Sequence, residues 1–219
     1  MKQFYGPEAL QKDTGVSRET LGRLQAYADL LAAWNKKINL IGRSTEGDVW
    51  QRHLLDSAQL FPLLPESSGP VLDLGSGAGF PGLALAIMGI PDVHLVESDQ
   101  RKAAFLREAA RIAQTTVTVH ARRIEELKPF PIRAVTARAL APLTDLLSWS
   151  APFLTSNSVC LFLKGQNVEV ELTDAYKTWS IGVEQIPSRT DPRGVIVCIK
   201  EVRRVSSDLP DLPDLPGVP

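Results

Sequence analysis

Asp73-Leu74-Gly75-Ser76-Gly77-Ala78-Gly79-Phe80-Pro81-Gly82 is the stretch that decides the fold. A short apolar run, residues 71–74, leads into it, and a segment rich in Leu and Ala, residues 82–88, follows. This order predicts a buried strand, a glycine loop and a helix. Alternating glycines let a backbone turn tightly and approach a ligand closely, and free N–H groups at a helix start attract anionic or electron-rich groups. The stretch therefore predicts a ligand-binding loop at the end of a strand.

Two ligand classes use such a loop. A dinucleotide fingerprint needs Gly at its first, third and sixth positions. Counted from Gly75 the sixth position is Phe80, so that register fails; counted from Gly77 the glycines fit, but Asp73 is left unexplained. An acidic residue on the strand followed by Gly-x-Gly-x-Gly is the pattern of S-adenosylmethionine enzymes. The spacing favours a methyltransferase over a dinucleotide-dependent oxidoreductase.

Strands and helices alternate on the carboxyl side of the loop. Strands are expected at residues 94–96, 117–120, from 135 and at 159–163, and helices at 101–113 and 143–151. A β-rich run at 194–202 is expected to pair with 183–186 as a hairpin. This alternation predicts an α/β fold with a mostly parallel sheet, helices on both faces and an antiparallel edge strand.

The amino-terminal segment has a helical period instead. Apolar residues recur at three- and four-residue steps over 17–41, and a second helix is expected at 47–61. We divide the chain into an N-terminal helical extension (1–65), a methyltransferase domain (66–205) and a Pro/Asp-rich tail (206–219) expected to be disordered. A docking role for the tail is the alternative.

Composition limits the function classes. The chain has 24 basic and 25 acidic residues, three of the acids lie in the tail, and the remainder carries +2, so nucleic acid would have to meet a local basic patch. No apolar run approaches the roughly 20 residues of a membrane span, and no signal peptide precedes the fold, which predicts a cytoplasmic location and no membrane partner. Cys160 and Cys198 lie in apolar stretches and are expected to be buried. No Cys/His cluster has zinc spacing, so no metal is expected.

Strand ends supply the candidate cofactor residues. Glu97 ends the second strand, where a carboxylate can accept hydrogen bonds from both ribose hydroxyls of either nucleoside cofactor. Ile124 and Glu125 follow the third strand, where an amide and a carboxylate could read the adenine edge. Arg138 ends the fourth strand, where a guanidinium can hold a carboxylate of the cofactor or a phosphate of RNA; the sequence leaves both open.

Candidate RNA contacts lie mainly before the glycine loop. A basic cluster surrounds the junction of the two first helices, as an RNA contact or simply a solvated face: Lys36, Lys37, Arg43 and Arg52. His53 and Asp56 lie three apart and share a helix face, so they either contact RNA or pair with each other. Lys164 follows the fifth strand, where it either contacts RNA or pairs with an acid at the sheet end.

The ordered motifs resemble a known family, the bacterial glucose-inhibited division protein B family of methyltransferases acting on guanine N7 in 16S ribosomal RNA. They are Trp34-Asn35-Lys36-x-x-Asn39-Leu40, Arg52-His53-x-x-Asp56-Ser57, the glycine loop, Arg123-x-Glu125-Glu126, Ala137-Arg138-Ala139 and Leu163-Lys164-Gly165. The resemblance implies a Rossmann-like class I methyltransferase fold with seven strands. It implies cofactor contacts at Gly75, Phe80, Ser98, Asp99, Ile124, Glu125 and Arg138, to which the loop pattern adds Gly77 and the strand ends add Glu97. Ile41 and Ala137 depart from the usual Thr and Ser.

The predicted reaction is methyl transfer from S-adenosylmethionine to N7 of a guanine in 16S ribosomal RNA, within the small subunit and by a monomer. N7 carries no proton, so no residue is expected to act as a catalytic base, and Arg138 is expected to position a reactant. A non-catalytic protein that binds S-adenosylmethionine or RNA is the other alternative.

Overall fold

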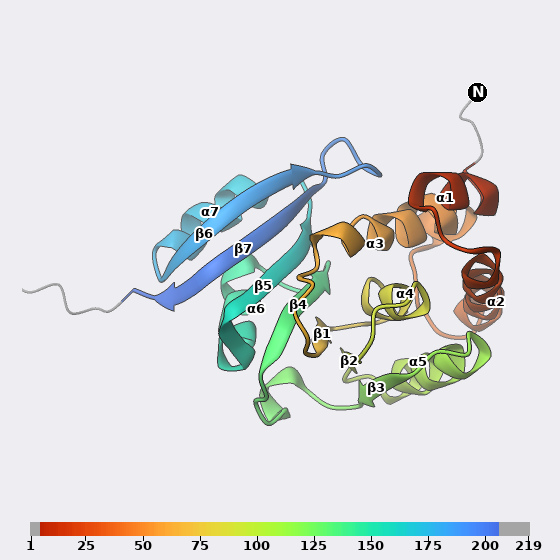
Figure 1. The fold of residues 1–219 in the computed structure, drawn as a ribbon, viewed down its shortest axis with the longest axis horizontal. Coiled ribbons are helices and arrows are strands. Elements are labelled where there is room, and N and C mark those ends of the chain that lie inside the picture. The colour runs from red at the N-terminus through yellow and green to blue at the C-terminus, as the bar shows by residue number, and fades with distance from the viewer. Residues whose placement is uncertain (1–4, 206–219) are drawn as a thin grey trace, which may run out of the picture.

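A seven-stranded sheet organises the computed structural model, which describes residues 5–205 (Figure 1). Its strand order is β3-β2-β1-β4-β5-β7-β6. The strands are β1 (Val71–Leu74), β2 (Val93–Val96), β3 (Val117–His120), β4 (Ile132–Arg138), β5 (Leu154–Lys164), β6 (Trp179–Pro187) and β7 (Val195–Arg204). The five strands from β3 to β5 are parallel, whereas β7 is antiparallel to both β5 and β6. The predicted α/β class, with its antiparallel edge and closing hairpin, is confirmed.

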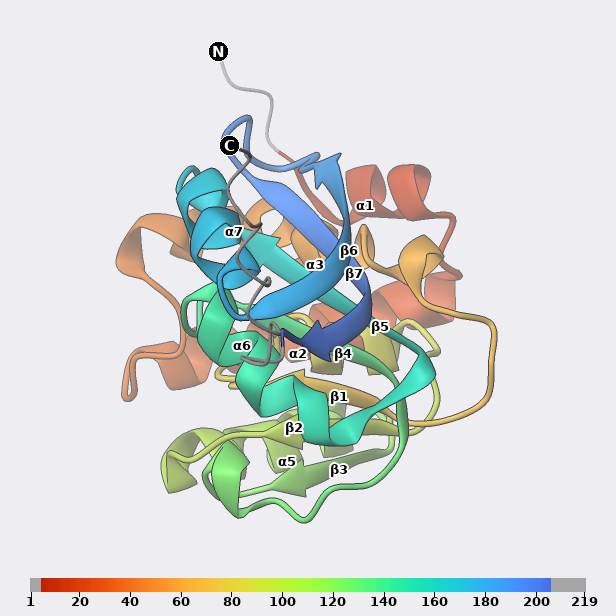
Figure 2. The same cartoon turned by 90° about the vertical axis from the view of Figure 1, so that its left-hand side faces the viewer.

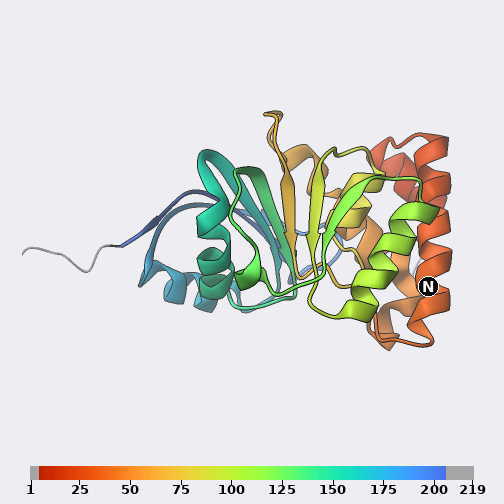
Figure 3. The same cartoon turned by 90° about the horizontal axis from the view of Figure 1, so that it is seen from below.

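Helices cover both faces of the sheet, as the view from below shows (Figure 3). They are α1 (Pro7–Thr14), α2 (Arg18–Asn35), α3 (Asp56–Ala58), α4 (Gly82–Ile87), α5 (Gln100–Ile112), α6 (Leu143–Ser150) and α7 (Val168–Tyr176). The helices α2, α4 and α5 pack together on one face, and α6 packs with α7 on the other. The hairpin strands β6 and β7 lie nearest the viewer in Figure 2. Neither α1 nor α7 was predicted.

Alternate residues of each strand enter two hydrophobic cores. In β1, Val71 belongs to the core beneath α2, α4 and α5, whereas Leu72 and Leu74 belong to the core beneath α6 and α7. The N-terminal helix α2 contributes to the first core through Tyr27, which is fully buried and whose hydroxyl donates to the carbonyl of Ala78 in the glycine loop. The N-terminal helices therefore share a core with the sheet, and the division at residue 65 remains an interpretation.

The two expected N-terminal helices are corrected. The first ends at Asn35 rather than near residue 41, because the Oδ1 atom of Asn35 accepts hydrogen bonds from the N–H groups of Leu40 (2.8 Å) and Ile41 (2.9 Å) and turns the chain. The second is no single α-helix. It consists of the 3₁₀ segment η1 (Arg43–Asp48), the π-helix η2 (Trp50–Leu55), α3 and the 3₁₀ turn η3 (Phe61–Leu63). Apolar periodicity finds a buried helical face but does not separate these helix types.

Cys160 and Cys198 are both buried and unpaired, as predicted. Within residues 5–205 no helix is long and apolar enough to cross a membrane. The tail, 206–219, lies outside the described residues.

Candidate active site

The glycine loop adopts a backbone that only glycine accepts easily. Gly75, Gly77 and Gly79 have φ values of 62°, 55° and 97°, in the left-handed region that other residues rarely adopt. Gly82 serves a different purpose: a Cβ atom there would lie 2.5 Å from the Cβ atom of Asp73, so the helix α4 can approach β1 only because the side chain is absent. The predicted strand, loop and helix are thus joined as the motif requires.

A cavity of about 400 Å³ lies over this loop, at the carboxyl ends of β1 and β2. That volume suits a small-molecule cofactor. Eight of the nine predicted cofactor residues line it: Gly75, Gly77, Phe80, Glu97, Ser98, Ile124, Glu125 and Arg138. The ninth, Asp99, caps the start of α5 and accepts from the N–H groups of Arg101 (2.8 Å) and Lys102 (3.4 Å), so its side chain serves the helix.

Glu97 is fixed in place before any ligand arrives. The residue is 8% exposed, and its two carboxylate oxygens accept hydrogen bonds from the N–H groups of Gly77 (2.9 Å) and Asp99 (2.7 Å). Each carboxylate oxygen has a further lone pair. Glu97 can therefore tie the glycine loop to the end of β2 and still accept hydrogen bonds from two ribose hydroxyls.

Several wall residues were missed by the sequence reasoning. Lys102 and Arg122 bring positive charge to the cavity, and Trp149 reaches it from α6. Leu140 covers the loop closely, because a Cβ atom on Gly75 would lie 2.5 Å from the Cδ1 atom of Leu140. Lys102 follows the predicted contacts at 98 and 99 in sequence, which was an available signal. Trp149 and Leu140 come from elements whose approach no local pattern gives.

Asp73 supports the loop from below and does not line the cavity. It is fully buried, and its Oδ1 atom accepts from the hydroxyl of Thr136 at 2.7 Å. Its Oδ2 atom has no hydrogen-bond partner within residues 5–205. Burial raises the pKa of this carboxyl to about 6, against the lowering effect of its hydrogen bonds.

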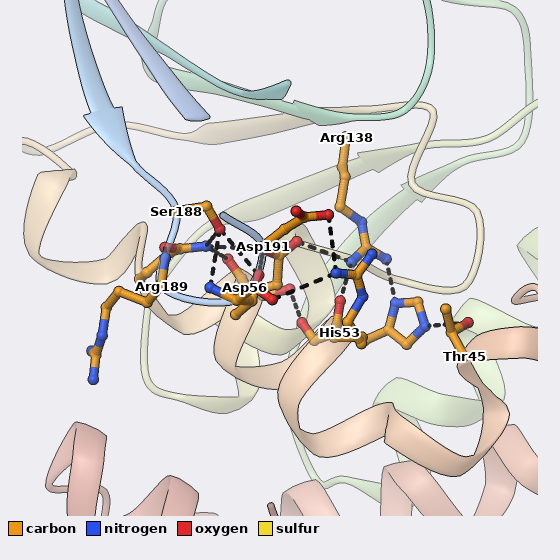
Figure 4. Close-up of polar contacts among 11 residues, drawn as sticks. Thr45, His53, Asp56, Arg138, Ser188, Arg189 and Asp191 are labelled. Carbon is orange, nitrogen blue, oxygen red and sulfur yellow. Dashed lines mark hydrogen bonds and ion pairs between the residues drawn. The ribbon is translucent and has the colours of Figure 1, made fainter. Parts of the chain in front are cut away.

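Arg138 stands at the centre of a polar network (Figure 4). Its Nη1 atom donates to the carbonyl of Arg52 (3.1 Å) and to Oδ2 of Asp56 (3.3 Å), and its Nη2 atom donates to Nδ1 of His53 (2.9 Å). Its guanidinium lies over the ring of Phe80, 5.0 Å from the ring centre. The sequence left His53 and Asp56 as RNA contacts or as partners of each other; in the structure both bind Arg138 instead.

A second cavity, of about 430 Å³, adjoins the first. Both are lined by Leu40, Arg138 and Ala139. The second is also lined by Arg52 and Lys164, together with His53. Arg138 therefore borders two adjacent spaces, one over the glycine loop and one beneath the hairpin loop between β6 and β7.

The predicted RNA residues fall into two groups. Lys36, Lys37 and Arg43 are exposed on the surface. Arg52 instead pairs with Asp191 at 3.1 Å. Lys164, 8% exposed, forms an ion pair at 2.5 Å with Glu171 of α7. Of its two predicted roles, an RNA contact or a pair with an acid, the structure shows the pair.

His53 differs from a surface RNA contact in its chemistry. It is 8% exposed, and its Nε2 atom contacts the hydroxyl of Thr45 at 3.0 Å while Nδ1 faces Arg138. Burial, with added repulsion from Arg138 and Arg52, lowers its pKa to about 3. The imidazole is therefore neutral at physiological pH. Residues 5–205 hold no group of three His, Cys, Asp or Glu side chains arranged for a metal ion.

The sheet order with its antiparallel β7, the glycine loop after β1 and the acid directly after β2 are typical of the Rossmann-like fold of S-adenosylmethionine-dependent methyltransferases. The fold is similar to that of a ribosomal protein L11 methylase from Lactobacillus delbrueckii subsp. bulgaricus, with a TM-score of 0.54, 16% identity and coverage of 66% of this chain and 75% of that one. It is also similar to a putative S-adenosylmethionine-dependent methyltransferase from Listeria monocytogenes, with a TM-score of 0.51, 14% identity and coverage of 66% and 96%.

Sequence comparison then gives the particular family. The model of the GidB family, rRNA small subunit methyltransferase G, matches residues 20–194, and this chain belongs to that family. A ribosomal RNA small subunit methyltransferase G of Paramagnetospirillum magneticum is 57% identical over 199 residues, covering 91% of this chain and 97% of the relative. Its counterpart in Rhodospirillum rubrum is 54% identical over 198 residues, covering 90% and 98%. The chain is thus an S-adenosylmethionine-dependent rRNA methyltransferase, and the oxidoreductase alternative was wrong.

Proposed function

We propose that this chain transfers a methyl group from S-adenosylmethionine to N7 of a guanine in the 16S ribosomal RNA of the small subunit. The observation that carries the proposal is the meeting of two cavities at Leu40, Arg138 and Ala139. The cofactor occupies the cavity over the glycine loop. The guanine enters the adjoining cavity, so the reacting atoms meet where the two spaces join.

The wall of the first cavity matches each part of the cofactor. Glu97 accepts from the ribose hydroxyls, while the amide of Ile124 and the carboxylate of Glu125 meet the adenine edge. Arg138, at the junction, holds the carboxylate of the methionine part. Once bound, the cofactor supplies a methyl group activated by its positive sulfur. The chain's own task is to place N7 close to that methyl and in line with the sulfur.

No side chain is needed to remove a proton, because N7 offers a lone pair in the ring plane and carries none. The structure agrees with this chemistry at His53, the histidine of the second cavity. Its neutral ring is engaged at both nitrogens and its pKa lies far below neutrality. With RNA saturating, the single-turnover rate should vary by less than about threefold between pH 6 and pH 9, a window that spans ordinary His and Cys pKa values. A tenfold rise would point to a titrating base and to a different target atom.

RNA reaches the second cavity past an exposed basic surface made by Lys36, Lys37 and Arg43. A small set of phosphate contacts fits the modest charge of the chain, and each lost contact should reduce the salt slope of RNA binding by about one unit. Extruding the guanine from its stack would bring it to the cavity. We place the reaction in the cytoplasm, on RNA assembled in the small subunit, with a monomer as the active species.

Transfer of labelled methyl to small subunits from cells that lack the protein, followed by mass mapping of the RNA, tests the reaction. Reconstituted RNA in which 7-deazaguanine replaces the mapped guanine is the matched control, because it lacks only the N7 atom. Label should enter the guanine and not the 7-deaza analogue. Label in both would place the methyl on another atom.

A further inference from the structure

We propose that His53 and Asp56 are positioning residues, which hold the Arg138 guanidinium so that one of its edges stays open for the carboxylate of the cofactor. This inference rests on the proposed function, since it assigns Arg138 to the cofactor instead of an RNA phosphate.

A guanidinium has five N–H donors and no acceptor. Three donors of Arg138 are used: both on Nη1, by Arg52 and Asp56, and one on Nη2, by His53. Within residues 5–205 the Nε–H group and the second Nη2–H group have no hydrogen-bond partner. Nε and Nη2 border the same edge of the planar group, and two parallel donors on one edge match the two oxygens of a carboxylate.

The Phe80 ring gives the guanidinium a further contact. The Cζ atom of Arg138 lies over this ring, 5.0 Å from its centre, and His53 stacks on the same ring with centroids 4.9 Å apart and an interplanar angle of 22°. Phe80 thus supports both the donor and one of its acceptors. A carboxylate approaching from the glycine loop meets a group already held in position, which lowers the entropy lost on binding.

His53 can do this in one tautomer. Arg138 only donates, so Nδ1 must carry the lone pair, and the proton lies on Nε2, from which it is donated to Oγ1 of Thr45 at 3.0 Å. A protonated ring would place an N–H against the guanidinium. The low pKa of His53, about 3, keeps the accepting form present throughout the physiological range.

The second carboxylate oxygen of Asp56 is fixed by the hairpin loop and by the neighbouring Gln59. Its Oδ1 atom accepts from the hydroxyl of Thr190 at 2.6 Å and from Nε2 of Gln59 at 2.9 Å, which leaves Oδ2 for Arg138. The side chains of Arg138 and Asp56 are only 18% and 13% exposed, so solvent screens this ion pair weakly. Neither acceptor can turn away without losing its other contacts.

The test compares two ligands that differ in the carboxylate alone. S-adenosylhomocysteine carries it, and 5′-S-(3-aminopropyl)-5′-thioadenosine keeps the thioether, the nucleoside and the amine but lacks it. By calorimetry the unaltered protein should prefer the first by about 30-fold, the range expected of charge-assisted hydrogen bonds. His53→Ala and Asp56→Ala should each lose about tenfold in affinity for S-adenosylhomocysteine and keep their affinity for the amine analogue, which also reports that the variant is folded.

A matched pair of substitutions adds the tautomer. His53→Asn puts an amide oxygen near the place of Nδ1 and should restore most of the preference, whereas His53→Gln puts its amide near the place of Nε2 and should not. His94→Asn is the control, because His94 contacts His120 and Asp92 and does not line either cavity. It should leave both affinities unchanged.

Three outcomes would overturn the inference. Equal loss of both ligands in the Ala variants would show a general structural role, and unchanged affinity for S-adenosylhomocysteine would show none. If the wild-type protein bound the two ligands equally well, Arg138 would not bind the carboxylate of the cofactor. The proposed methyl transfer would still stand. Failure to bind S-adenosylhomocysteine at all would instead reject the proposed function.

Discussion

Replacing His53 with Asn should change how the free energy of unfolding depends on pH. The folded pKa of His53 is about 3, while the unfolded chain has the ordinary value of 6.5. Below pH 6.5 the unfolded chain therefore binds a proton at His53 that the folded chain does not bind, so the free energy of unfolding falls as pH falls. Each pH unit below 6.5 lowers it by about 1.4 kcal/mol. Between pH 7.5 and pH 5 the wild-type protein should lose about 2 kcal/mol through this one residue, and the variant should lose none of it.

Urea denaturation followed by the fluorescence of the four tryptophans would measure the effect. The informative quantity is the difference between wild type and His53→Asn at each pH, because Asp73 and other carboxyls titrate in the same range and cancel in the difference. That difference should move by about 2 kcal/mol in favour of the variant on going from pH 7.5 to pH 5. A difference that stays constant to within roughly 0.5 kcal/mol would show that His53 protonates freely in the folded protein. It would refute the reasoning that His53 is a buried acceptor for Arg138.

Three further predictions concern the glycine loop and its support. Gly77→Val should bind S-adenosylhomocysteine at least tenfold more weakly by calorimetry, since a branched side chain at φ 55° would enter the cavity; unchanged affinity in a folded variant would move the cofactor elsewhere. Gly79→Ala should lower the free energy of unfolding by roughly 3 kcal/mol in urea denaturation, more than Gly89→Ala. Both glycines have positive φ, but only a Cβ atom at residue 79 would meet neighbours, Leu83 at 2.8 Å and Tyr27 at 2.9 Å. Equal losses in the two variants would show that backbone strain alone causes the effect. In Asp73→Asn, the free energy of unfolding should rise relative to wild type by about 2 kcal/mol between pH 4.5 and pH 7.5. The reason is that the folded pKa of Asp73, about 6, lies above the unfolded value of 3.8, so the wild-type protein loses stability as pH rises through that window. Parallel pH curves for the two proteins would show that Asp73 ionises normally.

The sequence predicted the strand, the glycine loop and the helix that follows because the constraints there are local. Alternating glycines and an acid that directly follows an apolar run, Glu97, are visible within short windows of the chain. The hairpin was found for the same reason: two β-rich runs near each other in sequence pair in register, Val183 with Ile199.

The partners of Arg138 could not be found in this way. His53 and Asp56 were correctly placed on one helix face, but they lie 85 and 82 residues before the guanidinium they bind. No periodicity tells which strand end lies opposite a helix face. Lys164 was ambiguous for the same reason, because its partner belongs to α7, a helix that the sequence reasoning did not predict.

The contact of Tyr27 with the glycine loop has a practical consequence for mapping this protein by deletion. A chain begun at residue 66 would lose the Tyr27 hydroxyl that donates to the Ala78 carbonyl. It would also expose the apolar face of α4 and α5, against which Tyr27 packs with its ring centre 6.3 Å from that of Phe105. Such a fragment would lose cofactor affinity and aggregate for reasons unrelated to RNA. The loss of activity after such a deletion would then be wrongly attributed to a loss of substrate binding by the N-terminal segment. Surface substitutions at Lys36 and Lys37, which leave that packing intact, separate recognition from support.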